Sequence, residues 1–151
     1  MTTVDPLIVS NNFLELGQRE NIDITPMKLQ KLLYFLYREF LKSTKEALFS
    51  DRFEAWKYGP VLSEVYYEFS HYRDKKISKF YQNSDGKYLK FNEDANEQFA
   101  IALHKVWNKY KYNSGIELSK ITHRSGTAWR KAWENNMKFL DDKDIMAEEA
   151  E

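Results

Sequence analysis

The strongest constraint on the fold comes from one helix-length segment, residues 26–41, whose apolar side chains cover most of its circumference. Thr25-Pro26 predicts its start, because Thr caps helices and Pro fits the first helical position. At 100° per residue, one continuous face carries Leu29, Leu32, Leu33, Leu36, Tyr37 and Phe40, widened by Met27, Tyr34 and Leu41. Only Lys28, Lys31, Arg38 and Glu39 remain as a polar strip. Such a helix must be covered on several sides, which predicts that it lies at the centre of the fold.

Helical periodicity also dominates the rest of the chain, with no repeat and no Pro-, Gly- or Ser-rich linker. Asp5-Pro6 predicts a further helix start, Ser114 and Glu117 form a capping-box pattern, and Gly59-Pro60 predicts a helix ending near Tyr72. Asp85-Gly86 between short aromatic runs predicts a small β-hairpin near residues 78–91. We therefore expect a mainly α fold: one compact domain, residues 1–151, with six or seven helices and one small hairpin.

Composition excludes several classes of protein. The chain has no cysteine, which excludes disulfides, thiolate metal sites and thiol nucleophiles. Its longest apolar run, Leu32 to Tyr37, is far shorter than the roughly 20 residues that span a bilayer. The first residues show no basic segment leading into an apolar one, so no signal peptide is predicted. We expect a cytoplasmic protein without a membrane contact.

Charge is balanced overall but not locally. Lys and Arg total 23, as do Asp and Glu, yet residues 141–151 carry six acids against one lysine. This acidic C-terminal tail is interpreted as a solvated tail or, alternatively, as an arm that meets a basic partner. No basic stretch is concentrated enough to make nucleic acid an expected partner.

Reaction chemistry finds little support in the sequence. The three histidines, His71, His104 and His123, are scattered, and no glycine pattern or metal-binding motif is present, so neither a cofactor nor a metal is expected. Ser119 and His123 are four residues apart and would face each other on a helix, which leaves a hydrolase as an alternative. No orienting acid or oxyanion hole accompanies them. The sequence therefore predicts a protein that is not an enzyme.

Two stretches are more specific than ordinary helix. Residues 53–61, FEAWKYGPV, place Trp and Tyr ahead of a Gly-Pro break. Residues 118–123, LSKITH, are followed by Trp129. Both are interpreted first as structural corners, in which aromatic rings set the angle between neighbouring elements.

With the segment TPMKLQKLLY at residues 25–34, these stretches resemble the Panacea antitoxin domain family, also called SocA-like or phage-associated GepA-like proteins. The resemblance extends over residues 25–133 and departs at the end, where the family often has a longer apolar helix. The matching positions, interpreted as structural, are Leu29, Lys31, Leu32, Tyr34, Ala55, Trp56, Tyr58, Gly59, Pro60, Val61, Ser119, His123 and Trp129.

The resemblance implies an antitoxin that neutralises a cognate protein toxin by direct contact, in a family whose members pair with unrelated toxins. It leaves two alternatives: a proteolytic adaptor that delivers the toxin to an unfoldase–protease, and a DNA-binding regulator. Candidates for contacting the partner are side chains that lie off the predicted core and charged side chains near residues 118–129. They are Phe35, Tyr67, Ile101, Arg124 and Arg130. No oligomeric state is predicted.

Overall fold

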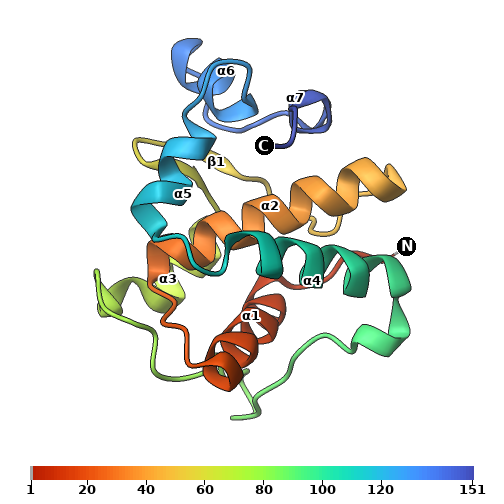
Figure 1. Cartoon of the computed structure of the whole chain (residues 1–151), viewed down its shortest axis with the longest axis vertical. Coiled ribbons are helices and arrows are strands. Elements are labelled where there is room, and N and C mark those ends of the chain that lie inside the picture. Colours follow the sequence, from red (N-terminus) through yellow and green to blue (C-terminus); the bar gives the residue numbers. More distant parts are fainter. Residues whose placement is uncertain (1) are drawn as a thin grey trace.

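The computed structural model describes residues 2–151, which form seven α-helices and one two-stranded antiparallel sheet (Figure 1). The elements are α1 (Pro6–Glu20), α2 (Pro26–Thr44), β1 (Glu54–Trp56), β2 (Gly59–Val61), α3 (Ser63–Phe69), α4 (Glu97–Tyr110), α5 (Gly115–Thr122), α6 (Ala128–Glu134) and α7 (Asp142–Ala147). Short 3-10 turns cover Ser70–Tyr72 and Glu93–Ala95. The prediction of a mainly α fold with six or seven helices and one hairpin is confirmed.

Helix α2 lies at the centre, as its apolar circumference predicts. The Thr25 hydroxyl accepts a hydrogen bond from the Lys28 amide at 3.3 Å and caps the helix, and Pro26 is its first residue. Helices α1, α3, α4, α5 and α7 and strand β2 all contact α2. In Figure 1, α2 crosses the middle of the molecule, with α4 and α1 on one side and α5, α6 and the hairpin on the other.

The polar strip of α2 is not a solvent-exposed face. Lys28, Lys31 and Arg38 are buried, as is Gln30 beside them, and each binds a polar group outside α2. Glu39 is half-buried and pairs with Lys105 of α4 at 2.7 Å. Lys28 Nζ, for example, donates to the carbonyl oxygen of Lys111, just after α4, at 2.5 Å. Buried polar groups need such partners, because an unpaired donor costs about 1–3 kcal/mol. The polar side chains of α2 therefore join elements together.

The hairpin predicted near residues 78–91 was misplaced. That segment contains no strand, and the antiparallel pair is β1–β2, in which Trp56 faces Gly59. The physical reason lies in α1: the Asn11 amide donates to the carbonyls of Tyr81 and Leu89 at 2.9 and 2.8 Å and accepts from the Tyr81 amide at 2.8 Å. The backbone at Tyr81 and Leu89 thus bonds to a side chain of α1 where the two arms of a hairpin would pair with each other. Between them the chain closes a turn, in which the Asn83 amide donates to the Lys87 carbonyl at 2.9 Å.

The predicted helix start at Gly59-Pro60 is also wrong, because both residues belong to β2 and the helix begins at Ser63. Its expected end near Tyr72 lies in the 3-10 turn that follows α3. Gly59 and Pro60 follow the hairpin turn and begin β2. Val61 and Leu62 then connect them to the first residue of α3.

The acidic C-terminal segment is packed against the fold, so its interpretation as a solvated tail is wrong. Asp141 caps α7, and Ile145 is buried. Glu148, at 2% exposure, accepts hydrogen bonds from Tyr34, Arg38 and the Ala128 amide. The acids that looked like a free arm therefore include one of the most deeply buried charges of the protein.

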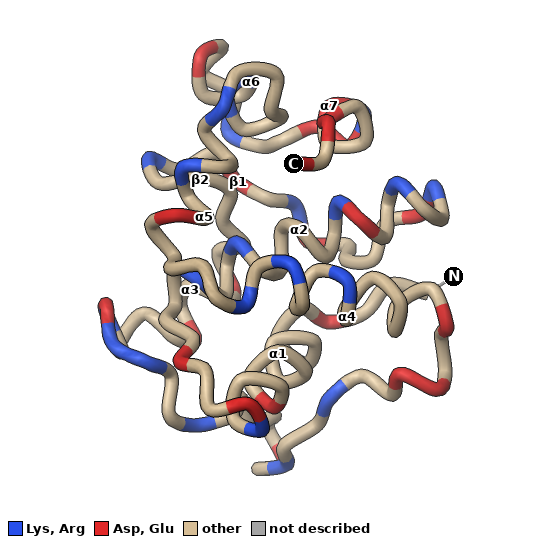
Figure 2. The backbone as a smooth tube through the Cα atoms, viewed as in Figure 1, with Lys and Arg blue, Asp and Glu red and all other residues tan. Residues whose placement is uncertain are grey.

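Among residues 2–151, no helix combines the length and the apolar composition that crossing a bilayer demands. Lys and Arg are interspersed with Asp and Glu along the tube in Figure 2.

Candidate functional site

The three sequence segments that stood out meet at the hairpin turn. Three consecutive backbone carbonyls of the turn each face a side chain of α5, α6 or the residue after α5. Trp129 Nε1 donates to the carbonyl oxygen of Trp56 at 2.6 Å. His123 Nε2 lies 2.9 Å from that of Lys57, and Ser119 Oγ donates to that of Tyr58 at 2.6 Å. Residues 119–129 therefore fix the position of the hairpin backbone through side-chain hydrogen bonds.

Helix α2 holds the same backbone from the other side. Lys31 Nζ donates to the carbonyl of Pro60 at 3.3 Å. The Gln30 amide donates to the carbonyl of Leu62 at 3.0 Å and accepts from its amide at 2.9 Å. We call these five side chains, Gln30, Lys31, Ser119, His123 and Trp129, the hairpin clamp. It fixes residues 56–62 through main-chain atoms, so its hydrogen bonds do not depend on the side chains of Lys57 and Tyr58.

The hydrolase alternative fails on the geometry of Ser119 and His123. His123 Nδ1 lies 2.5 Å from the backbone carbonyl oxygen of Ser119 and does not contact its hydroxyl, which is bound to Tyr58. Both ring nitrogens of His123 are therefore engaged with backbone carbonyl oxygens. No nucleophile–base hydrogen bond is present at this pair. Residues 2–151 also contain no group of three or more His, Asp or Glu side chains arranged to hold a metal ion.

Lys31 is the one lysine of the hairpin clamp, and it is buried. This burial lowers the pKa of its amine from 10.5 to about 7. The unfolded chain keeps this lysine protonated up to its ordinary pKa, whereas the folded protein releases the proton near pH 7. Stability from this group therefore rises with pH between about 7 and 10.5, and the full burial penalty is present below pH 7.

We expect the free energy of unfolding to rise by about 1 kcal/mol per pH unit between pH 7.5 and 9, and this slope to flatten in Lys31→Met. Urea titrations at a series of pH values measure it. Lys45→Met, at an exposed helix end, is the control and should keep the wild-type slope. An unchanged slope in Lys31→Met would contradict the assignment.

Beside the clamp lies an open groove, which we call the motif groove. It is lined by Met27, Tyr58, Ile116, Ser119, Lys120, His123, Arg124, Ser125 and Arg130. Tyr58, at the tip of the hairpin, is 57% exposed, and Ile116, on α5, is 64% exposed. Large exposed apolar side chains that gather at one place mark interaction sites. The groove thus combines a rigid backbone with apolar side chains that are open to a partner.

The predicted contact residues fall into three groups. Arg124 and Arg130 line the motif groove. Tyr67 on α3 and Ile101 on α4 are 73% and 53% exposed and lie outside the groove lining. Phe35 is wrong as a surface residue: it is buried, and its ring stacks on that of Tyr110 with centroids 4.3 Å apart, because α4 covers this side of α2.

Sequence reasoning missed Met27, Ile116 and Lys120. Helix α5 approaches the start of α2 closely at Gly115. A Cβ added to Gly115 would lie 2.9 Å from the Lys28 amide nitrogen and 3.1 Å from Met27 Cβ. This close approach sets α5 against the start of α2. The only local signal was an isoleucine placed directly after the Ser114-Gly115 helix start, on the side away from Leu118.

Aromatic rings extend the surface beyond the groove. Trp133, which is exposed, stacks on Trp129 at 5.3 Å between centroids, and Trp129 contacts His123 at 3.8 Å. On the other side of the hairpin, Tyr66 packs against Trp56 at 4.8 Å and against Tyr67 at 5.6 Å. Tyr67 is therefore the outer end of an aromatic cluster that begins at the hairpin.

Comparison with known proteins gives one consistent result. Residues 29–130 match the family model "Antitoxin SocA-like, Panacea domain". Antitoxin SocA of Caulobacter vibrioides (strain NA1000 / CB15N) is 31% identical over 130 residues, which cover 84% of this chain and 69% of that protein. No solved structure matches significantly. The family match begins within α2 and ends at Arg130, so it contains all five side chains of the hairpin clamp.

Proposed function

Since this chain belongs to the SocA-like antitoxin family with a Panacea domain, we propose that it is the antitoxin of a toxin–antitoxin pair and neutralises a cognate protein toxin by direct contact through the motif groove. The observation that carries the proposal is the hairpin clamp, which holds the backbone under the exposed Tyr58. A side chain presented on a fixed backbone loses little conformational freedom on binding. Tyrosines of this kind are frequent among the residues that dominate binding energy.

The groove supports binding better than chemistry. Ser119 and His123 are engaged with backbone carbonyls. The second serine, Ser125, is exposed, and the other lining side chains are apolar, aromatic or cationic. Neutralisation by contact asks for an interface of roughly 1,600 Å² with a few central anchors. Tyr58 and Ile116 are candidates for such anchors, because both line the groove and both are exposed.

Tyr58→Ala is expected to weaken binding of the toxin by about 2–4 kcal/mol, or roughly 30- to 1,000-fold. The toxin is sought as the product of an adjacent gene that cannot be maintained alone, and rescue of growth on co-expression is the first measurement. Calorimetry with the purified pair measures the affinity. Tyr112→Ala is the matched control, because Tyr112 is 82% exposed and lies outside the groove.

Failure of the wild-type chain to relieve the neighbour's toxicity would sink the proposal. The half-life of the toxin separates masking from delivery to a protease, because an adaptor shortens it and a mask leaves it unchanged or lengthens it. Binding to the promoter of its own operon with a steep dependence on salt, in the absence of toxin binding, would instead indicate a DNA-binding regulator.

A further inference from the structure

We infer that the motif groove receives an acidic segment of the partner protein, in which carboxylates flank an apolar side chain. This inference rests on the proposed function, because the partner is taken to be the toxin. It concerns the chemistry of the bound segment, which neither the family match nor the relative's name specifies.

The charge of the groove is one-sided. Its nine lining residues include three permanent cations, Lys120, Arg124 and Arg130, and no acid. The chain as a whole balances 23 basic against 23 acidic residues, so an acid-free surface of this size departs from its average. A cationic surface favours encounter with an anionic partner and raises the association rate.

The rim already binds a carboxylate from the chain itself. The guanidinium of Arg124 lies 3.1 Å from Glu151 Oε2. Glu151 also pairs with Arg38 at 2.7 Å, so this acid bridges the buried centre and the edge of the groove. Arg124 is thus placed where a carboxylate reaches it, which is the contact that an acidic partner segment would extend.

The other two cations are available in different ways. Lys120 is exposed, and its side chain forms no hydrogen bond or salt bridge within residues 2–151, although Glu117 lies close enough to interact with its charge. Arg130 is fixed by a hydrogen bond from Nε to the carbonyl of His123 at 2.9 Å. Its outer nitrogen lies 3.6 Å from Glu134, an exposed and loose pair. Replacing Lys120 therefore removes no hydrogen bond from the fold, whereas replacing Arg130 removes its hydrogen bond to His123.

The apolar residues of the groove favour a polypeptide over a nucleic acid. Met27 and Ile116 are aliphatic, and Tyr58 is the one aromatic side chain of the lining apart from His123. Single-stranded nucleic acids use aromatic platforms on which successive bases stack, and duplexes need a longer row of phosphate contacts. An apolar side chain of a peptide, flanked by carboxylates, matches both the apolar residues and the cations of the lining.

Lys120→Glu, alone and combined with Arg124→Glu, tests the inference. In 50 mM salt we expect the association rate with the toxin to fall about tenfold for the double variant, and about threefold or less in 500 mM salt, where charges are screened. The control is Lys75→Glu with Lys87→Glu, two exposed lysines outside the groove that change the net charge by the same amount. Circular dichroism and the thermal midpoint show that each variant folds.

The partner side gives a second measurement that does not depend on Arg124. Overlapping peptides that tile the toxin are tested for binding to the full antitoxin chain, and those that bind should be acidic and lose binding to Lys120→Glu. If Tyr58→Ala abolishes toxin binding but the charge reversals leave the rate unchanged, the acidic-segment inference is overturned and the proposed function stands. If neither change affects toxin binding, the motif groove is not the binding surface, and both the acidic-segment inference and the proposed neutralisation through this groove are wrong. If the reversals act only on binding to duplex DNA, the groove serves nucleic acid and the inference is wrong.

Discussion

Glu148→Gln is expected to lower the free energy of unfolding by about 3 kcal/mol, since removing one member of a buried ion pair leaves the other charge without compensation. Glu148 Oε2 lies 2.7 Å from a guanidinium nitrogen of Arg38, with both side chains at 5% exposure or less. Its Oε1 accepts from the Tyr34 hydroxyl at 2.5 Å and from the Ala128 amide at 2.7 Å. A glutamine at this position would place its NH2 group, a hydrogen-bond donor, against one of the groups that donate to Glu148, so that one hydrogen bond would be lost.

The charges of this cluster depend on one another. Burial alone would lower the pKa of Arg38, but hydrogen bonds to Glu151 and Glu148 raise it above its ordinary value. Burial and the neighbouring Glu148 carboxylate raise the pKa of the Tyr34 hydroxyl, which stays protonated and donates. Glu151 keeps one ion pair with Arg38 in the variant, so the expected loss lies at the lower end of the range for buried pairs.

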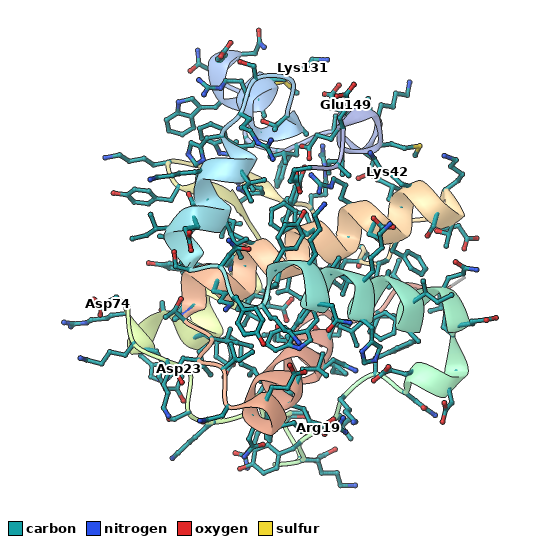
Figure 3. All side chains as sticks on the ribbon, viewed as in Figure 1. Arg19, Asp23, Lys42, Asp74, Lys131 and Glu149 are labelled. Atoms are coloured by element: carbon teal, nitrogen blue, oxygen red, sulfur yellow. The ribbon has the colours of Figure 1, made fainter. Side chains whose placement is uncertain are left out.

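Glu149→Gln is the matched control, because it makes the same chemical change one residue away. Glu149 lies on the surface at the end of α7 (Figure 3), and the change should stay within about 0.5 kcal/mol. Urea denaturation of the two variants measures the difference. Equal stabilities would show that the C-terminal segment is not held as the structure has it.

Gly59→Ala is expected to cost about 4 kcal/mol, through backbone strain and through the absence of space for a methyl group. The φ angle of Gly59 is +119°, a conformation that residues with a Cβ rarely adopt. An added Cβ would lie 2.7 Å from Thr122 Oγ1 and 2.8 Å from Lys31 Cε. Both neighbours are buried and hydrogen-bonded, so neither moves aside without a loss.

Gly86→Ala separates the two causes. Gly86 also has a positive φ, +74°, but nothing lies within 4 Å of its added Cβ. Strain alone should cost about 1–2 kcal/mol there. The excess at Gly59 then reports the missing space inside the hairpin clamp together with its less accessible φ angle. The readout is the midpoint of chemical denaturation for each variant. An equal loss at the two glycines would mean that the backbone of the turn moves easily.

Local signals were enough to predict much of the fold. Asp5 and Thr25 cap α1 and α2 as their sequence positions imply, and Ser114 with Glu117 forms the expected capping box. The apolar circumference of α2 predicted its central place correctly. These features depend on neighbours within one helical turn or on the composition of a single helix face, which a sequence displays directly.

Features that depend on distant partners were not predictable in the same way. Asn11 captures the backbone of residues 81 and 89 from a helix some 70 positions earlier, which prevents the hairpin that Asp85-Gly86 suggested. Phe35 was a candidate contact because it lies off the main apolar face of α2, and helical periodicity does not reveal that α4 covers that position. Glu148 looked solvated because Arg38 is 110 positions away. Of the nine residues that line the motif groove, only Arg124 and Arg130 were among the predicted partner contacts. Met27, Ile116 and Lys120 were missed because the contact between the starts of α2 and α5 joins residues far apart in the sequence.

The hairpin clamp grips only carbonyl and amide groups of residues 56–62, and this has a consequence for how such a protein changes over generations. Any amino acid at positions 57 and 58 offers the same carbonyl oxygens to His123 and Ser119. Mutations there alter what the tip presents while its course through space stays the same. New binding preferences are thus accessible by single replacements that leave the scaffold's stability nearly untouched.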